Sequence, residues 1–173
     1  MIPTDDVPSN TRAAASQADT DDDQRPAPVR IRGLLMAQSY AVLCTQSQSQ
    51  PYGSLIAFAA SDDLKTIVFA TPVATRKYRL LTECEHVALV IDSRAAFPSD
   101  MMRLEAVTAT GRARVVGAGT EFDCWAGLLI ARHPHLATFV KAESSALVCV
   151  EVVRYLHVCR FQEVRQWVPG SAS

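Results

Sequence analysis

The sequence has no hydrophobic run long enough to cross a bilayer, and its first residues show no basic segment followed by an apolar core. We therefore expect neither a membrane span nor a secretory leader. Neither sign of charge is in large excess, because the chain has 17 basic and 18 acidic residues and a net charge of −1. A general nucleic-acid-binding surface would be strongly basic, so we expect no nucleic-acid partner.

Cysteine is present without a pattern. The five cysteines are odd in number, scattered, and never form a C-x-x-C pair. This excludes a disulfide framework and a zinc knuckle, and it indicates reduced thiols in a cytoplasmic protein. The sequence also lacks a Ser/His/Asp arrangement and paired carboxylates, so hydrolytic chemistry is unsupported and the catalytic residues stay unknown. His133 and His135 flank a proline and share no helical face, which indicates a helix boundary and no metal site.

Aromatic residues are missing from residues 1–28, which hold four of the nine prolines and six aspartates against Arg12 and Arg25. Such a segment cannot bury enough apolar surface to offset the entropy lost on ordering, so we predict a disordered acidic tail. The remainder carries 15 basic and 12 acidic residues, a net charge near +3 that suits a small phosphorylated ligand. Residues 29–169 are predicted to form one globular domain, and residues 170–173 a flexible C-terminus.

The hydrophobic pattern predicts short strands in hairpin order with helices inserted between them. Strands are expected at residues 40–45, 54–60, 66–70, 87–92, 107–116, 146–153 and 155–161. Helices are expected at residues 31–39, 75–84 and 134–140, and from Thr120, where Thr120-x-x-Asp123 resembles a capping box. The first three strands have connections too short for crossover helices, so they are antiparallel. The fold class is therefore mainly β with peripheral α-helices, an antiparallel barrel of about six strands.

The segment from Ala70 to Lys77 is the strongest candidate for a ligand site. A predicted strand ends there, and a loop of small residues leads into a helix whose first turn holds Thr75, Arg76 and Lys77. A helix N-terminus offers unpaired backbone N–H groups and a partial positive charge, which together bind phosphate. The same dipole disfavours cations in the first turn, so Arg76 and Lys77 indicate a function such as phosphate binding. The residues alone leave a second interpretation open, a threonine N-cap followed by two solvated side chains.

Three further features have structural interpretations. Arg112 and Arg114 share one strand face, which either extends a phosphate or substrate pocket or is solvated. His157 lies among strand residues and is interpreted as a satisfied, semi-buried histidine. Trp125 falls on the apolar stripe of the helix that starts at Thr120 and is expected in the core.

Five short segments follow one another along the chain: AVLCT (41–45), PYGSLI (51–56), VFATPVATRK (68–77), VALVID (87–92) and TGRARVV (110–116). Together they resemble the pyridoxamine 5′-phosphate oxidase-like family of FMN-binding split barrels, and the resemblance extends from about Ile31 to Trp167. Each is short, and their order and spacing carry the resemblance. It implies an antiparallel six-stranded split β-barrel that binds FMN in a cleft between the two subunits of a homodimer.

The resemblance also assigns residues to the cofactor. Thr75, Arg76 and Lys77 correspond to the residues that hold the FMN phosphate. Further cofactor-binding positions, along the ring and its edge, are Ser54, Leu55, Ile56, Ala70, Thr71 and Trp167. Of these, Trp167 would come from the partner subunit, together with the stretch Glu105–Thr108.

Two departures from the family pattern narrow the function. True pyridoxamine 5′-phosphate oxidases carry an Arg and a Lys on the second strand, where this chain is apolar near Leu55 and Ala60. They also carry a C-terminal Arg-Trp…Arg-Leu-x-Pro signature, which is replaced here by the different pattern of residues 161–169. The resemblance thus implies an FMN-dependent oxidoreductase for an unidentified small molecule, and not a true pyridoxamine 5′-phosphate oxidase. A non-catalytic flavin carrier or sensor, a haem-binding or haem-degrading barrel, and a deazaflavin as cofactor remain as alternatives.

Overall fold

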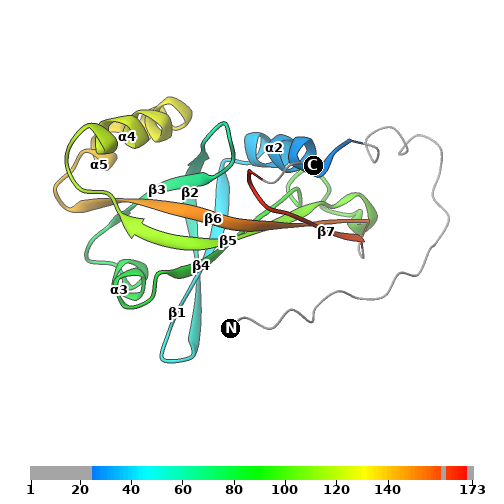
Figure 1. Cartoon of the computed structure of the whole chain (residues 1–173), viewed down its shortest axis with the longest axis horizontal. Helices are drawn as coiled ribbons and strands as arrows, with labels where there is room; N and C mark the ends of the chain where they lie inside the picture. The colour runs from blue at the N-terminus through cyan, green and yellow to red at the C-terminus, as the bar shows by residue number, and fades with distance from the viewer. Residues whose placement is uncertain (1–24, 161–162, 171–173) are drawn as a thin grey trace.

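The computed structural model describes residues 25–160 and 163–170, which form seven antiparallel strands and four α-helices (Figure 1). The strands are β1 (Tyr40–Ser47), β2 (Gln50–Ala60), β3 (Thr66–Pro72), β4 (His86–Asp92), β5 (Ala106–Val115), β6 (Ser145–Cys159) and β7 (Glu163–Trp167). The helices are α2 (Ala27–Ala37), α3 (Arg76–Glu83), α4 (Thr120–Arg132) and α5 (Ala137–Val140). Short 3-10 turns cover Met101–Arg103 and Pro134–Leu136. In the described part of the chain, no helix is both long and apolar enough to span a membrane.

The sheet closes on itself through β6. Its strand order is β3-β2-β1-β4-β5-β6-β7, and an additional pairing joins β3 to β6. The closed ring therefore holds six strands, which confirms the predicted antiparallel six-stranded split barrel. Strand β6 makes closure possible because it is 15 residues long: its first half pairs with β3 and its last five residues pair with β7.

The last part of the barrel differs from the prediction. The two strands expected at 146–153 and 155–161 are one strand, β6, and the following β7 was not predicted. A register shift explains the apparent break, because Thr110 pairs with Arg154 whereas Gly111 pairs with Val152, which leaves Val153 bulged. A Cβ atom at Gly111 would overlap the carbonyl oxygen of Glu151, so the close approach at this bulge requires glycine.

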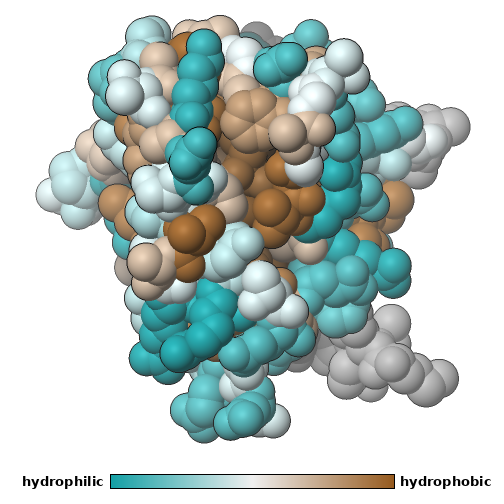
Figure 2. Space-filling model, turned by 90° about the vertical axis from the view of Figure 1, so that its left-hand side faces the viewer, coloured by the Kyte–Doolittle hydropathy of each residue, from teal (hydrophilic) through white to brown (hydrophobic). Residues whose placement is uncertain are grey.

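Two hydrophobic cores lie on opposite faces of β2 and β3. Phe58 and Phe69 point into the barrel, whereas Ala59 and Val68 point outward into a second core beneath α4 and α5. This confirms the expectation that the second strand is apolar on both faces and central in the barrel. Figure 2 shows the end of the molecule where α3, α4 and α5 lie, with hydrophobic patches in the middle of the face and polar side chains around them.

Helix α2 begins at Ala27, four residues earlier than predicted, and Pro28 lies in its first turn, where a proline is tolerated. The predicted tail boundary at residue 28 therefore lies inside the helix, and residues 1–24 of that tail lie outside the described part. The C-terminal end of α2 is held by Arg132, whose guanidinium donates to the carbonyls of Leu35, Met36 and Gln38. These bonds fix α2 to α4 across the barrel end.

The predicted capping box at the start of α4 is wrong. Gly119 is the N-cap with a φ of 132°, and no side chain caps the helix. Thr120 is already helical, so its hydroxyl is one position too late to cap, and the N–H of Asp123 donates to the Gly119 carbonyl. The predicted apolar stripe is confirmed, with Leu129 buried and Trp125 partly buried at the edge of the outer core.

Candidate functional site

Two threonine hydroxyls organise the loop between β3 and α3. Thr71, at the end of β3, is fully buried, and its Oγ1 lies 3.1 Å from that of Thr75. The Thr75 hydroxyl donates to the carbonyl of Pro72 (2.8 Å) and accepts from the N–H of Tyr78 (3.3 Å). Since a hydroxyl has one proton to give, Thr71 is the donor in the Thr71–Thr75 contact. The loop is thereby fixed in shape, with Thr75 as the N-cap of α3.

The first turn of α3 presents backbone donors. The hydroxyl of Thr75 accepts from the N–H of Tyr78, and its carbonyl accepts from the N–H of Arg79. Within residues 25–160 and 163–170, the amide N–H groups of Arg76 and Lys77 have no acceptor. These free N–H groups lie at the positive end of the helix dipole. The first turn holds no acidic residue that would neutralise this end of the helix. It is therefore suited to an external anion.

The two cations of this turn are held by uncharged groups. The Arg76 guanidinium carbon lies 4.8 Å from the centroid of the Tyr52 ring. The Nζ of Lys77 donates to the carbonyl oxygen of Leu55 at 3.1 Å, and burial lowers the pKa of this amine. No ion pair of either cation with an acidic side chain occurs in the described chain. Both positive charges are thus available to a negatively charged ligand.

The three predicted site residues on β2, Ser54 to Ile56, differ in where their side chains lie. The carbonyl of Leu55 contacts Lys77, while the Leu55 side chain is 65% exposed on the outside of the barrel. Ser54 has a buried Oγ that lacks a hydrogen-bond partner in the described structure. Ile56 is 4% exposed and belongs to the interior core, so it could face a ligand through its backbone alone.

Two other predicted site residues do not point their side chains to this loop within the single chain. The side chain of Ala70 packs on the outer core beneath α4 and α5. Trp167 is the last residue of β7, a strand that pairs with β6 and is drawn well away from α3 in Figure 1. Its ring stacks on Tyr155 with centroids 5.7 Å apart, and its Nε1 is buried without a partner in the described residues. A single chain therefore does not bring Trp167 to the Thr71–Lys77 loop.

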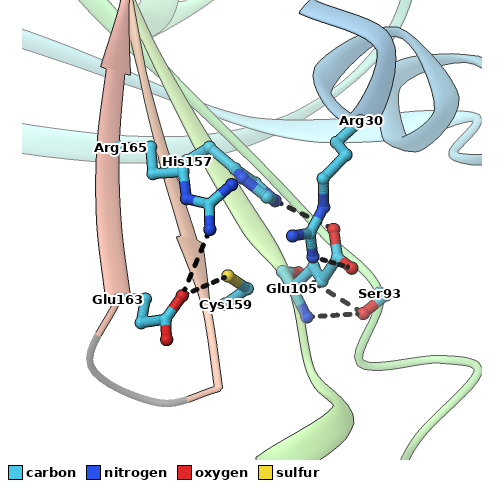
Figure 3. A network of polar contacts seen from close by, with 7 residues as sticks. All are labelled: Arg30, Ser93, Glu105, His157, Cys159, Glu163 and Arg165. Atoms are coloured by element: carbon cyan, nitrogen blue, oxygen red, sulfur yellow. Dashed lines mark hydrogen bonds and ion pairs between the residues drawn. The ribbon is translucent and has the colours of Figure 1, made fainter. Parts of the chain in front are cut away.

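Glu105, expected near the partner's flavin ring, is engaged within its own chain (Figure 3). Its carboxylate accepts from His157 Nε2 and from Arg30, each at 2.8 Å. These bonds lower the pKa of Glu105 to about 2, with the histidine bond as the largest cause. His157 is fully buried, and its Nδ1 has no partner in the described structure, so the predicted satisfied histidine is satisfied at one nitrogen. No sequence pattern indicated this network.

The remaining candidates have structural roles. His133 is buried and its Nε2 lies 2.9 Å from the carbonyl of Phe58. Arg112 is exposed and pairs with Glu85, and Arg114 pairs with Glu121 and Glu151, so the face they share is solvated and internally paired. Across residues 25–160 and 163–170, no group of three or more His, Cys, Asp or Glu side chains could hold a metal ion.

The closed six-stranded antiparallel barrel, with α3 following its third strand, is the architecture of the split-barrel class. Comparison with known families agrees, since the family model described as pyridoxamine 5′-phosphate oxidase matches residues 28–159. The chain therefore belongs to the pyridoxamine 5′-phosphate oxidase family. No curated protein sequence matches it.

Solved structures show the same fold at low sequence identity. A haem-binding protein from Mycobacterium smegmatis has a TM-score of 0.73 and 16% identity, over 84% of this chain and 59% of that one. A FAD-binding protein from Mesorhizobium loti has a TM-score of 0.62 and 11% identity, over 76% of this chain and 94% of that one. The haem storage protein from Vibrio cholerae has a TM-score of 0.60 and 14% identity, over 85% and 96%. The chain thus spans less than two thirds of the mycobacterial protein.

Proposed function

We propose that the protein binds FMN, with the phosphate held at the start of α3. The main observation is that the loop fixed by the Thr71–Thr75 contact brings together the free amides of Arg76 and Lys77 and two cations that, in the described chain, have no acidic partner. Amides and cations both donate to phosphate oxygens, so the residues present fit a phosphate monoester. The FAD-binding neighbour from Mesorhizobium loti supports a flavin. Strand β2 has no basic residue, so Arg76 and Lys77 would carry the phosphate recognition.

We further propose a homodimer with the cofactor at the interface. On the outer face of β1, β4 and β5, two cross-strand rows carry no charge and are half-buried in the single chain. The rows are Val42–Val90–Thr108 and Cys44–Ala88–Thr110. The second row lines a cavity of about 470 Å³, together with Val153, which is 54% exposed, and with Arg112 and Arg154. The uncharged rows favour burial against a second copy, which would also supply Trp167 to the flavin of its partner.

The expected activity is that of a flavin-dependent oxidoreductase acting on a small molecule. Bound flavin supplies the hydride or electron transfer, while the chain binds and orients it. We assign no catalytic acid or base, and a flavin carrier without turnover has the same site. The vitamin B6 substrate is not proposed, because β2 lacks the two cations of true pyridoxamine 5′-phosphate oxidases. The five free thiols support a cytoplasmic setting.

Haem binding is the second candidate, supported by the names of the mycobacterial and Vibrio neighbours. An axial histidine has to be accessible, but His133 and His157 are buried and hydrogen-bonded to Phe58 and Glu105. His86 and His135 are exposed. These two histidines meet the accessibility requirement, and His86 lines the cavity of about 470 Å³. Flavin stays the first candidate because free amides and two cations meet at the start of α3.

The absorption spectrum of the freshly purified protein tests the proposal. We expect flavin bands, and extraction with mass measurement should identify FMN. A Soret band, or a deazaflavin in the extract, would contradict the assignment. Oxidation of NADH or NADPH by the flavin-loaded protein would then distinguish an enzyme from a carrier.

A further inference from the structure

The β-bulge on β6 faces the outer-face cavity of about 470 Å³. Thr110 pairs with Arg154 whereas Gly111 pairs with Val152, so Val153 has no residue opposite it on β5. Successive side chains of a regular strand point to opposite faces, but at this bulge Val153 and Arg154 both line the cavity. The bulge thus directs two adjacent side chains to a cavity whose volume is within the range of small-molecule sites.

Two arginines line this cavity, and no acidic residue is among its lining residues in the described part of the chain. Arg154 is half-buried, and its side chain makes no hydrogen bond or ion pair within residues 25–160 and 163–170. Arg112 pairs with Glu85, but the two atoms are 3.8 Å apart and both side chains are more than half exposed. Because an exposed pair of this kind contributes little, Arg112 is able to bind another anion.

The position of Arg154 on the sheet makes its lack of an acidic partner significant. Arg154 continues the uncharged row Cys44–Ala88–Thr110, because it is the residue paired with Thr110. In the proposed homodimer this row is buried against a second copy, so the guanidinium of Arg154 would lose most of its water. A charge removed from water requires an opposite charge and hydrogen bonds, and the cavity has room for an anion that supplies both.

The cavity lies on the sheet face next to the proposed flavin site. Cys44, which lines it, pairs with Gly53 of β2, and Gly53 is two residues from Leu55, whose carbonyl accepts from Lys77. Strands are about 4.8 Å apart and rise about 3.4 Å per residue, so the backbone of Cys44 lies roughly 8 Å from Leu55. A ligand in the cavity would therefore be a neighbour of the flavin ring. Apolar surface for its body comes from Ala88 and Val153.

We propose that this cavity binds the substrate of the flavin, a small organic anion with an apolar body, whose anionic group is held by Arg154 and Arg112. Arginine suits this role, because its planar fork matches carboxylate and phosphate oxygens. The ligand's role as substrate rests on the proposed flavin function. Its binding does not, because no residue assigned to the cofactor lines the cavity.

Calorimetric titration of the full-length protein, as purified, with sodium benzoate tests this proposal. We expect Arg154→Gln to weaken benzoate binding about tenfold or more, as loss of one charge-assisted contact implies, while the flavin content per chain stays unchanged. Arg112→Gln should also weaken binding, and it keeps the test valid if the first variant fails to fold. Arg114→Gln is the matched control, because Arg114 lies on the same face of β5, pairs with Glu121 and Glu151, and does not line the cavity.

Several results would overturn the proposal. Equal benzoate affinity in the Arg154→Gln and Arg114→Gln proteins, or equally tight binding of neutral benzyl alcohol, would contradict an anion site. Loss of flavin together with benzoate in Arg154→Gln would assign the cavity to the cofactor. Dissociation of the dimer with unchanged benzoate affinity would assign Arg154 to a carboxylate of the partner subunit. A Soret band with added haem that His86→Gln removes would assign the cavity to haem.

The flavin content of the same preparation separates this proposal from the proposed function. Benzoate binding that depends on Arg154 in a protein without flavin would confirm the anion site and refute the flavin. Flavin bands in a protein that does not bind benzoate would refute the anion site and leave the flavin proposal intact.

Discussion

The Nζ of Lys77 donates to the carbonyl oxygen of Leu55 at 3.1 Å and so joins the first turn of α3 to the middle of β2. This contact brings a cation to the strand along which the resemblance places the isoalloxazine ring. A neutral carbonyl is a weak partner for an ammonium group whose pKa is lowered by burial. A phosphate would be a stronger one, and Lys77 could reach it by a change of rotamer.

Arg76→Ala combined with Lys77→Ala should abolish FMN retention while the barrel stays folded. Each charge-assisted hydrogen bond to a phosphate contributes about 1.5–3 kcal/mol, so we expect the Kd to rise roughly a hundredfold or more. Flavin fluorescence titration measures this change. Arg79→Ala is the control, because Arg79 lies on the same helix and pairs with Glu83. Unchanged FMN affinity in the double variant would refute the phosphate site.

Tyr52 is expected to position Arg76. If the ring orients the guanidinium, Tyr52→Leu weakens FMN binding a few-fold, since an exposed cation–π contact contributes about 0.5–1 kcal/mol. Tyr52→Phe keeps the ring and should bind as the natural chain does. In the Arg76→Ala background, Tyr52→Leu should have no further effect. Equal losses in the Phe and Leu variants would show that the hydroxyl, and not the ring, matters.

Most of the barrel was predictable, because strands that bury one face alternate with a period of two, as residues 107–116 do. The break expected near Arg154 was wrong since a bulge at Val153 interrupts this alternation without ending the strand. The loop from β3 to α3, with Thr75 as the N-cap of the helix, was predictable because it is local in sequence. The Arg30–Glu105–His157 network was not, because its members are 75 and 52 residues apart and meet through the closure of the barrel.

Ala88→Arg should disrupt the proposed dimer. Ala88 lies in an uncharged cross-strand row, and a second copy packed there would bury the new guanidinium without a partner. Light scattering should report twice the 18.8 kDa chain mass for the natural protein and a monomer for the variant. The variant should also lose FMN, if the partner completes the site. Ala131→Arg, an exposed position on α4, is the control. A dimeric Ala88→Arg protein would contradict this interface.

Glu105→Gln should destabilise the fold in a pH-dependent way. The folded pKa of Glu105, about 2, lies below its ordinary value, so its contribution is complete above pH 4.5 and is lost as the pH falls toward 2. We expect the variant to lose on the order of 2 kcal/mol in urea unfolding at pH 7 and much less at pH 3. Glu85→Gln, which breaks an exposed pair with Arg112, should cost under about 0.5 kcal/mol. A loss of the same size at both pH values would assign the effect to packing instead.

Two truncations separate the predicted tail from the first helix. Deletion of residues 1–24 should leave the Tm unchanged within about 1 °C, because such a segment adds little buried apolar surface. Deletion of residues 1–28 should lower it by roughly 2–6 °C, as the loss of about 1–2 kcal/mol implies. The longer deletion removes the Pro26 carbonyl that accepts from Val29 and Arg30, and it removes Ala27, which packs on the interior core. Differential scanning calorimetry compares the two proteins directly. An equal drop in both would show that residues 1–24 dock on the barrel, and no drop in either would show that the first turn of α2 contributes nothing to stability.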